Sequence, residues 1–151
     1  MQKYIGTKII EAVPAIRKGG KVYEEGWPIP KSMDPTEEGY KVRYPDGYES
    51  WSPKDVFEEA YRPTDCMSFG LAIEAMKKGK KVARRGWNGK NQHIELATRI
   101  SYMTAEGVFV NVDHEAIGNK AIAFRGTSGV QMGWLASQAD MLADDWEIVE
   151  A

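Results

Sequence analysis

Basic and aromatic side chains follow one another closely after residue 77, and their chemistry suits an anionic ligand. The nine residues 77–85 carry six positive charges, the last two of which are Arg84 and Arg85. Trp87 follows, and after it comes an Asn-Gly pair that is typical of turns. A guanidinium group binds phosphate through paired hydrogen bonds, and an indole ring stacks on a nucleobase. The segment therefore predicts a site for a flat, anionic molecule.

The lysines of this run have a simpler explanation than the arginines. Two of them fall in the last turn of a predicted helix, where the helix dipole favours cations, and the other two can be solvated. Arg84 and Arg85 are consecutive in a predicted strand, so they point to opposite faces. One of them is expected to face the core or a cleft and to need an anionic or aromatic partner there. The sequence does not decide which one.

Trp134 is a second tryptophan that could bind a flat ligand. It lies just before a predicted helix, whereas Trp87 lies just before a predicted turn. Both tryptophans are open to two interpretations. Most tryptophans of small domains are part of the core, and these two can simply fill it. Alternatively, two indole planes beside arginines can form a pocket in which a base stacks and a phosphate is bound.

An acidic cluster, Asp140, Asp144 and Asp145, lies near the end of the last predicted helix, where the helix dipole disfavours negative charge. A hydrolase could use these carboxylates to hold Mg²⁺ beside a phosphate. They can also be structural, with Asp140 a polar helix position. The two histidines have no metal-ligand spacing to each other or to Cys66, and no nucleophile motif occurs. We therefore expect a protein that is not an enzyme and has no metal or cofactor.

The composition excludes several classes of partner. The 151 residues carry a net charge of −2, and the sequence pI is about 5.8, which argues against binding of duplex nucleic acid through its phosphates. No apolar run is long enough to span a bilayer, and the first residues lack the apolar stretch of a secretory signal. A single cysteine fits a reducing compartment. These features predict a cytoplasmic protein with no membrane partner.

A proline-containing break after the first predicted helix, at residues 62–65, indicates a domain boundary. We therefore predict two small domains, residues 1–63 and 64–151. In the first we expect a strand over residues 4–10, a loop-rich stretch to Pro35, and a hairpin whose turn lies at residues 45–47. A helix then begins with Ser52 as N-cap and Pro53 at its first position. Its expected buried stripe is Val56, Phe57, Ala60 and Tyr61.

The second domain is expected to pack one helix on an antiparallel meander, which makes the fold class α+β. Ser68 is the predicted N-cap of a helix with apolar residues at helical spacing, and Gly79 ends that helix. The predicted strands cover residues 82–85, 92–97, 108–112 and 121–124. A short helix over residues 137–143 and a closing strand over residues 146–149 follow.

Taken in order, these residues resemble the phage anti-Thoeris sponge proteins of the second type. The pattern comprises Met67-Ser68-Phe69-Gly70, Ala72, Gly79, Val82, Arg84, Trp87-Asn88-Gly89, Trp134, Asp140-Met141-Leu142-Ala143 and Asp145-Trp146. The resemblance covers about residues 66–149. It implies a small α+β domain that assembles as a homotetramer and sequesters the cyclic ADP-ribose isomers made by bacterial TIR-domain immune proteins. Some relatives also hold cyclic oligonucleotides of CBASS immunity in separate pockets.

The resemblance also implies site residues. Phe69, Trp87, Asn88, Trp134 and Asp140 match the shared pattern and, together with the two arginines, complete the candidate ligand site. The family often has prolines beside the second tryptophan, where this chain has Gly133 and Ala136. The first 62 residues resemble a small phage-encoded domain with no known activity.

The hypothesis drawn from the sequence is a phage sponge that binds a small cyclic nucleotide signal in the host cytoplasm without degrading it. Two alternatives stay open. One is a metal-dependent hydrolase of the same signal that uses Asp140, Asp144 and Asp145, and the other is a phage structural or interaction module whose tryptophans serve protein contacts.

Overall fold

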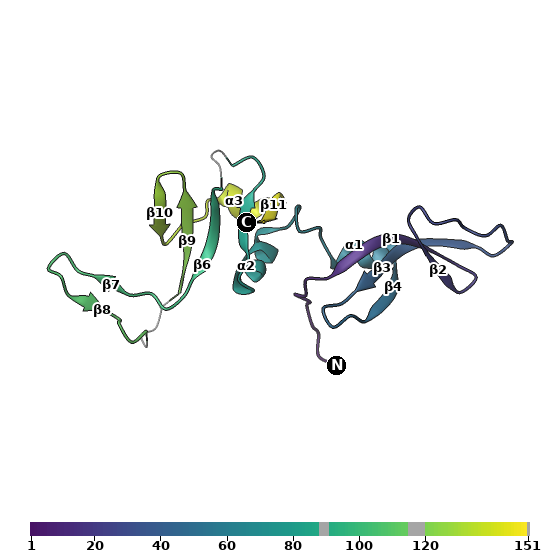
Figure 1. The fold of residues 1–151 in the computed structure, drawn as a ribbon, viewed down its shortest axis with the longest axis horizontal. Coiled ribbons are helices and arrows are strands. Elements are labelled where there is room, and N and C mark those ends of the chain that lie inside the picture. Colours follow the sequence, from purple (N-terminus) through teal and green to yellow (C-terminus); the bar gives the residue numbers. More distant parts are fainter. Residues whose placement is uncertain (88–90, 115–119, 151) are drawn as a thin grey trace. The chain divides into compact units, whose positions relative to one another are not determined.

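The fold is α+β, with mostly antiparallel strands and few helices. The computed structural model describes residues 1–87, 91–114 and 120–150. The chain divides into two compact units, Met1–Arg62 and Pro63–Ala151, which are described separately below (Figure 1). No helix among the described residues is long and apolar enough to cross a membrane.

The first unit is a four-stranded antiparallel sheet with one short helix. Its strand order is β2-β1-β3-β4. The elements are β1 (Glu11–Lys18), β2 (Lys21–Glu24), β3 (Thr36–Arg43), β4 (Glu49–Pro53) and α1 (Lys54–Ala60). The predicted hairpin is confirmed as β3 and β4. Its turn ends at Gly47, which has φ +90°, a conformation that favours glycine, and the side chain of Asp46 accepts the Tyr48 N–H at 3.0 Å.

Trp51 fixes one face of this sheet. Its indole Nε1 donates to the carbonyl of Ala15 at 3.0 Å, and the Arg17 guanidinium lies 4.2 Å from the ring centroid. The ring lies over Gly39, where a Cβ atom would collide with both the indole and the Ser52 carbonyl. Gly39 is therefore required for the close approach of the ring, because any side chain there would occupy the same space.

Four details of the first unit differ from the sequence predictions. Residues 4–10 form no strand: β1 begins only at Glu11, where pairing with β3 starts. The stretch to Pro35, predicted to be rich in loops, contains the paired strands β1 and β2. Ser52 does not cap α1, because it pairs with Tyr40 inside β4, and Pro53 takes the N-cap position without a side-chain hydrogen bond. The apolar stripe of α1 is only partly as predicted. Phe57 stacks on Tyr40 with 4.2 Å between centroids, whereas Val56 and Ala60 are exposed and no residue of α1 is fully buried.

The second unit has a five-stranded antiparallel sheet of order β10-β9-β6-β5-β11 (Figure 1). Its strands are β5 (Lys81–Arg84), β6 (His93–Ala97), β9 (Ala121–Gly126), β10 (Gly129–Met132) and β11 (Trp146–Val149), and its helices are α2 (Phe69–Lys77) and α3 (Gln138–Leu142). The run β5-β6-β9-β10 is a meander, whereas the last strand, β11, returns to lie beside β5.

Helix α2 follows its local signals. Ser68 accepts the Leu71 N–H at 3.3 Å as the predicted N-cap, and Gly79 follows the helix end with φ +86°. Its inner face packs on β5, β6 and β11 and contributes to the core. The buried cluster consists of Met67, Ala72, Ala75, Met76, Val82, Ile94 and Trp146.

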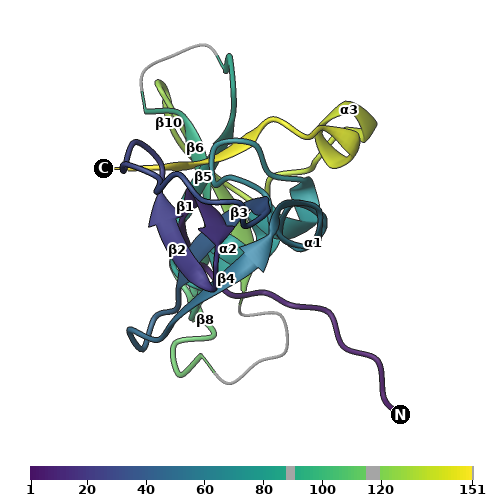
Figure 2. The ribbon, with the colours of Figure 1, turned by 90° about the vertical axis from the view of Figure 1, so that its right-hand side faces the viewer.

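The predicted strand over residues 108–112 is not part of the meander. Only Phe109–Val110 form a strand, β8, and it pairs with β7 (Tyr102–Met103) in a separate two-stranded sheet. Figures 1 and 2 both show β8 away from the five-stranded sheet. Where the chain leaves the meander after β6, Arg99 has φ +56°, a left-handed conformation that changes the direction of the backbone.

Candidate functional site

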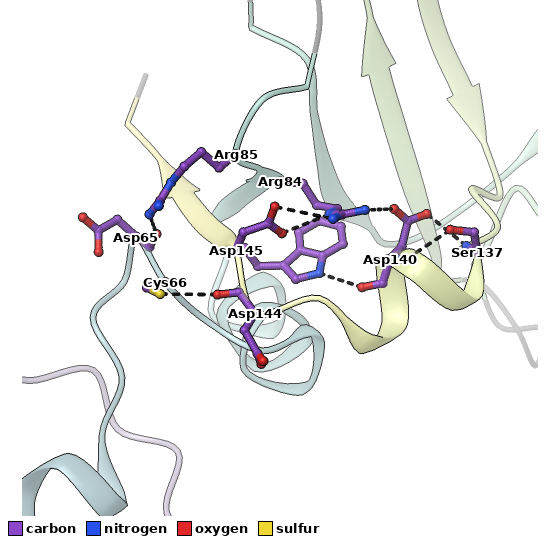
Figure 3. A network of polar contacts seen from close by, with 9 residues as sticks. Asp65, Cys66, Arg84, Arg85, Ser137, Asp140, Asp144 and Asp145 are labelled. Atoms are coloured by element: carbon purple, nitrogen blue, oxygen red, sulfur yellow. Dashed lines mark hydrogen bonds and ion pairs between the residues drawn. The ribbon is translucent and has the colours of Figure 1, made fainter.

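Arg84 lies at the end of β5 and connects two segments that are distant in the sequence. Its Nε donates to Asp145 at 3.0 Å, a second guanidinium nitrogen lies 3.4 Å from the other oxygen of Asp145, and a third donates to Asp140 at 3.0 Å (Figure 3). Hydrogen bonds to Asp145 and then Asp140 raise the pKa of Arg84 above its ordinary value, although burial lowers it. Arg84 is therefore a permanent cation between two carboxylates.

Asp140 has both of its carboxylate oxygens engaged by protein. One oxygen accepts from Arg84, and the other accepts the Ser137 N–H at 3.0 Å, while the hydroxyl of Ser137 accepts the Asp140 N–H at 3.1 Å (Figure 3). This is a capping box at the start of α3. Burial raises the pKa of Asp140, but the hydrogen bonds from Ser137 and Arg84 outweigh it, so the pKa lies below its ordinary value.

The backbone of Asp140 adds a third connection. Its carbonyl oxygen accepts a hydrogen bond from the indole Nε1 of Trp146 at 2.9 Å. Trp146 is completely buried, so its N–H needs such an acceptor. Asp140 thus joins α3, β5 and the core at one point, and this polar network sets the position of the segment that follows Trp134.

Contrary to the prediction, Arg85 is not part of β5 but lies in the turn that follows the strand, and it is exposed. Its guanidinium donates to the backbone carbonyl of Asp65, and nearby the Cys66 Sγ lies 3.4 Å from the carbonyl oxygen of Asp144 (Figure 3). The prediction that one of the two arginines faces the core side and meets anionic groups is confirmed, and that arginine is Arg84. Which arginine meets a ligand stays a prediction.

Trp87 and Trp134 lie together, although 46 residues separate them in the sequence. Their ring centroids are 5.9 Å apart at an interplanar angle of 62°. Both pack edge-on against buried Trp146, at 5.4 and 6.1 Å respectively. Phe124 contacts Trp87 at 5.7 Å, and Phe69 contacts Trp134 at 6.4 Å and Trp146 at 5.2 Å. The five rings form one aromatic cluster at the edge of the core.

The cluster shows how Trp87 contributes to the core. The Trp87 ring contacts three other aromatic rings of the cluster, one of which belongs to the buried Trp146. Trp87 and Trp134 are nevertheless only partly buried, in contrast to Trp146. The two interpretations of these residues are therefore compatible, since each ring can support the core with one edge and keep another edge accessible.

The remaining predicted residues are placed as follows. Phe69, the first residue of α2, belongs to the aromatic cluster, and Asn88 lies outside the described residues. Sequence reasoning did not assign Asp145 and Ser137 to the Arg84 network, nor Phe124 and Trp146 to the aromatic cluster. The sequence Ser137-Gln138-Ala139-Asp140 does carry the spacing of a capping box, which is a local signal for Ser137.

The acidic cluster is divided between two surroundings. Asp140 and Asp145 both face Arg84, whereas Asp144 is exposed. Within residues 1–87, 91–114 and 120–150, no group of three or more His, Cys, Asp or Glu side chains is placed to hold a metal ion. Arg84 occupies oxygens of Asp140 and Asp145 that a bound cation would otherwise contact.

The second unit thus combines an antiparallel sheet, two capped helices, an arginine held by two aspartates and a partly exposed aromatic cluster. Comparison with known proteins gives the class: this is a phage anti-defence protein directed against Thoeris immunity. Residues 67–149 match the Thoeris anti-defense 2-like domain, and the chain belongs to this Tad2-like family. "Thoeris anti-defense 2" of Bacillus phage SP01 is 37% identical over 84 residues, which are 55% of this chain and 94% of that protein.

Proposed function

We propose that the second unit binds and sequesters a cyclic nucleotide immune signal, in the first place a cyclic ADP-ribose isomer of the Thoeris system, without degrading it. CBASS cyclic oligonucleotides are a second class of ligand under this proposal. The protein would act in the cytoplasm of the infected host and assemble as a homotetramer. Membership of the anti-Thoeris family is the observation that carries the proposal.

The aromatic cluster supports binding of a base. Trp87 and Trp134 meet edge to face with their planes inclined at 62°, and both side chains are only partly buried. An adenine ring can stack on either indole face, with about 1 to 3 kcal/mol per stacked base. The Arg84 network supports this arrangement because it holds the start of α3, and through it the segment after Trp134, against β5.

Sequestration without turnover is supported by the state of the carboxylates. Arg84 forms ion pairs with both Asp140 and Asp145, and hydrogen bonds hold Asp140 in its ionised form. A general acid needs a raised pKa, whereas the pKa of Asp140 is lowered. The arrangement therefore suits a rigid binding wall better than proton transfer or metal-assisted hydrolysis.

The test separates binding from degradation. Calorimetry with a cyclic ADP-ribose isomer should give a sub-micromolar dissociation constant, about −8 kcal/mol or better. Protein and ligand are then incubated with Mg²⁺ and denatured, and the ligand should be recovered intact. Trp134→Ala should weaken binding, whereas Trp27→Ala, which removes a tryptophan of the first unit, should not. A degraded ligand would support the hydrolase, and no heat with any cyclic nucleotide would contradict the proposal.

A further inference from the structure

Strand β9 contacts both tryptophans of the candidate ligand site, although it carries neither of them. It lies between β6 and β10 in the five-stranded sheet (Figure 1). Ile122 and Phe124 of β9 are partly buried, and both pack against the buried core cluster. Because they are two residues apart in a strand, their side chains point to the same face of the sheet. This part of β9 therefore lies against the aromatic cluster.

Ile122 holds Trp134 through the backbone. Its carbonyl oxygen accepts hydrogen bonds from the N–H groups of Gly133 and Trp134, at 3.0 and 2.8 Å. Gly133 has φ +81°, a conformation that favours glycine and lets the chain turn at the end of β10. The acceptor belongs to a strand that is paired on both sides, so the backbone of Trp134 is tied to the sheet.

Phe124 contacts Trp87 through its ring. The two ring centroids are 5.7 Å apart, and the ring planes are inclined at 68°. The backbone of Phe124 pairs with the fully buried Ile94 of β6 on one side and with Gln131 of β10 on the other. The base of the side chain is therefore fixed in the sheet, and its ring is a firm support for the indole.

The orientation of Trp87 depends on such ring contacts. Its backbone lies just after the turn that follows β5, so strand pairing does not set the direction of its side chain. Trp134 and Trp146 contact the indole at 5.9 and 5.4 Å, with interplanar angles of 62° and 76°, and Phe124 is the third ring. Without Phe124 the indole loses one of its three supports and gains freedom to tilt.

The ring of Phe124 needs the space above Gly126. A Cβ atom at Gly126 would lie 2.7 Å from Cε1 of Phe124, and 3.5 and 3.6 Å from its Cζ and Cδ1. Carbon atoms are in favourable contact only at about 3.5 to 4.0 Å, so one of the two groups would have to move. Gly126 is not among the glycines with positive φ. The space for the ring, and not the backbone conformation, therefore requires glycine at this position.

We infer that Phe124 is a positioning residue of the ligand site: it sets the plane of Trp87 relative to Trp134, and Gly126 provides the space that its ring requires. Since β9 also ties the backbone of Trp134, this one strand determines the angle between the two indoles. The effect on the ligand rests on the proposed function, because it needs a base that stacks on Trp87. The effect on the indole planes does not.

The first test removes the ring of Phe124 and keeps an apolar side chain. In Phe124→Leu of the full chain, the near-ultraviolet circular dichroism of the tryptophans should change, because the coupling of neighbouring indoles depends on their relative orientation. The dissociation constant of a cyclic ADP-ribose isomer should rise roughly three- to tenfold, the scale of one aromatic contact. The matched control is Leu96→Ala in β6, which also removes packing from a partly buried residue of the same core. The folded control should keep the tryptophan spectrum and the affinity of the parent.

The second test displaces the ring without removing it. Gly126→Ala places a methyl group where the Phe124 ring lies, so it should change the tryptophan spectrum and weaken nucleotide binding, as Phe124→Leu does. When Gly126→Ala is added to Phe124→Leu, neither measurement should change much further, because the ring atoms that the Cβ meets are gone. Such non-additivity is typical of residues that act through one contact. Gly126→Ala also decides the inference if Phe124→Leu does not fold, because it retains the whole ring.

The two measurements separate this inference from the proposed function. A changed spectrum and weaker binding in both single variants, without further loss in the double variant, support the positioning role. Parent-like affinity in folded Phe124→Leu would overturn that role and leave the proposed function in place. Additive losses in the double variant would also overturn it, because the two residues would then act separately. A parent that binds no cyclic nucleotide would overturn the proposed function and the role of Phe124 in binding, while the spectra would still decide whether its ring orients Trp87.

Discussion

At the scale of single residues, Trp87 has a role in the core that its position beside a turn does not reveal. Its ring contacts Phe124, Trp134 and Trp146. We expect Trp87→Ala to lower the free energy of unfolding by about 3 kcal/mol, because the aromatic contacts are lost and a cavity forms. Denaturant unfolding followed by circular dichroism measures this change.

The same variant tests the ligand site. Below its unfolding transition, Trp87→Ala should also lose about 1 to 3 kcal/mol of nucleotide binding by calorimetry, if the accessible edge of the ring contacts the base. Trp27→Ala is the control for general effects of tryptophan removal. Full nucleotide affinity in folded Trp87→Ala would show that Trp87 contributes to the core but not to ligand binding.

Asp140 predicts a specific dependence of stability on pH. Its pKa is lowered in the folded protein, so its contribution to stability is complete above the pKa of the unfolded chain, about 3.9. This contribution decreases as the pH falls towards the folded pKa, because the carboxylate is then protonated. The free energy of unfolding should fall less steeply below about pH 4 in Asp140→Asn than in the parent.

The comparison needs a control for carboxylates in general. Asp144→Asn serves, because Asp144 is exposed and its side chain has no part in the Arg84 network. Its pH profile should follow that of the parent. Identical profiles for the parent and Asp140→Asn would show that the network does not hold Asp140 in its ionised form.

At the scale of elements, the sheet of the first unit depends on one close approach. A Cβ atom at Gly39 of β3 would collide with the Trp51 indole and with the Ser52 carbonyl of β4. Gly39→Ala should therefore destabilise the first unit by about 1 to 3 kcal/mol, because either the ring or the strand pairing must shift. Gly6→Ala is the matched control, since a Cβ at Gly6 meets nothing within 4 Å.

The measurement for Gly39 needs a signal from the first unit alone. Amide hydrogen exchange of β1, β3 and β4 supplies it, since these strands should lose protection in Gly39→Ala while α2 and β5 keep theirs. Equal protection of β3 in both variants would show that Trp51 moves aside without cost.

At the scale of the whole molecule, the two units have separate cores, and the family match lies entirely within the second. We expect residues 63–151 alone to fold cooperatively and to bind the nucleotide within about 0.5 kcal/mol of the full chain, as for independent sites. Calorimetry on the fragment and the full chain checks this. A much weaker fragment would assign part of the ligand site to the first unit.

Local signals in the sequence were sufficient for several elements. Ser68 and Gly79 bounded α2, and the turn at residues 45–47 located the β3–β4 hairpin. These predictions were correct because capping and turn conformations depend on a few neighbouring residues. The prediction that Ser52 caps α1 was wrong because it considered only neighbouring residues. Serine suits an N-cap, but pairing with Tyr40 kept Ser52 in β4, since tertiary contacts override local preference.

The sequence by itself therefore determined the class of fold, the ends of the main helix, the exclusion of a strongly basic surface and the pattern shared with anti-Thoeris proteins. Only the tertiary structure decided which groups meet. Arg84 hydrogen-bonds to Asp140 and Asp145, which follow it by 56 and 61 positions in the sequence, because β11 pairs with β5. Trp87 contacts Trp134 because both rings pack on the buried Trp146. Partners so distant are selected by chain topology and packing, which no local pattern encodes.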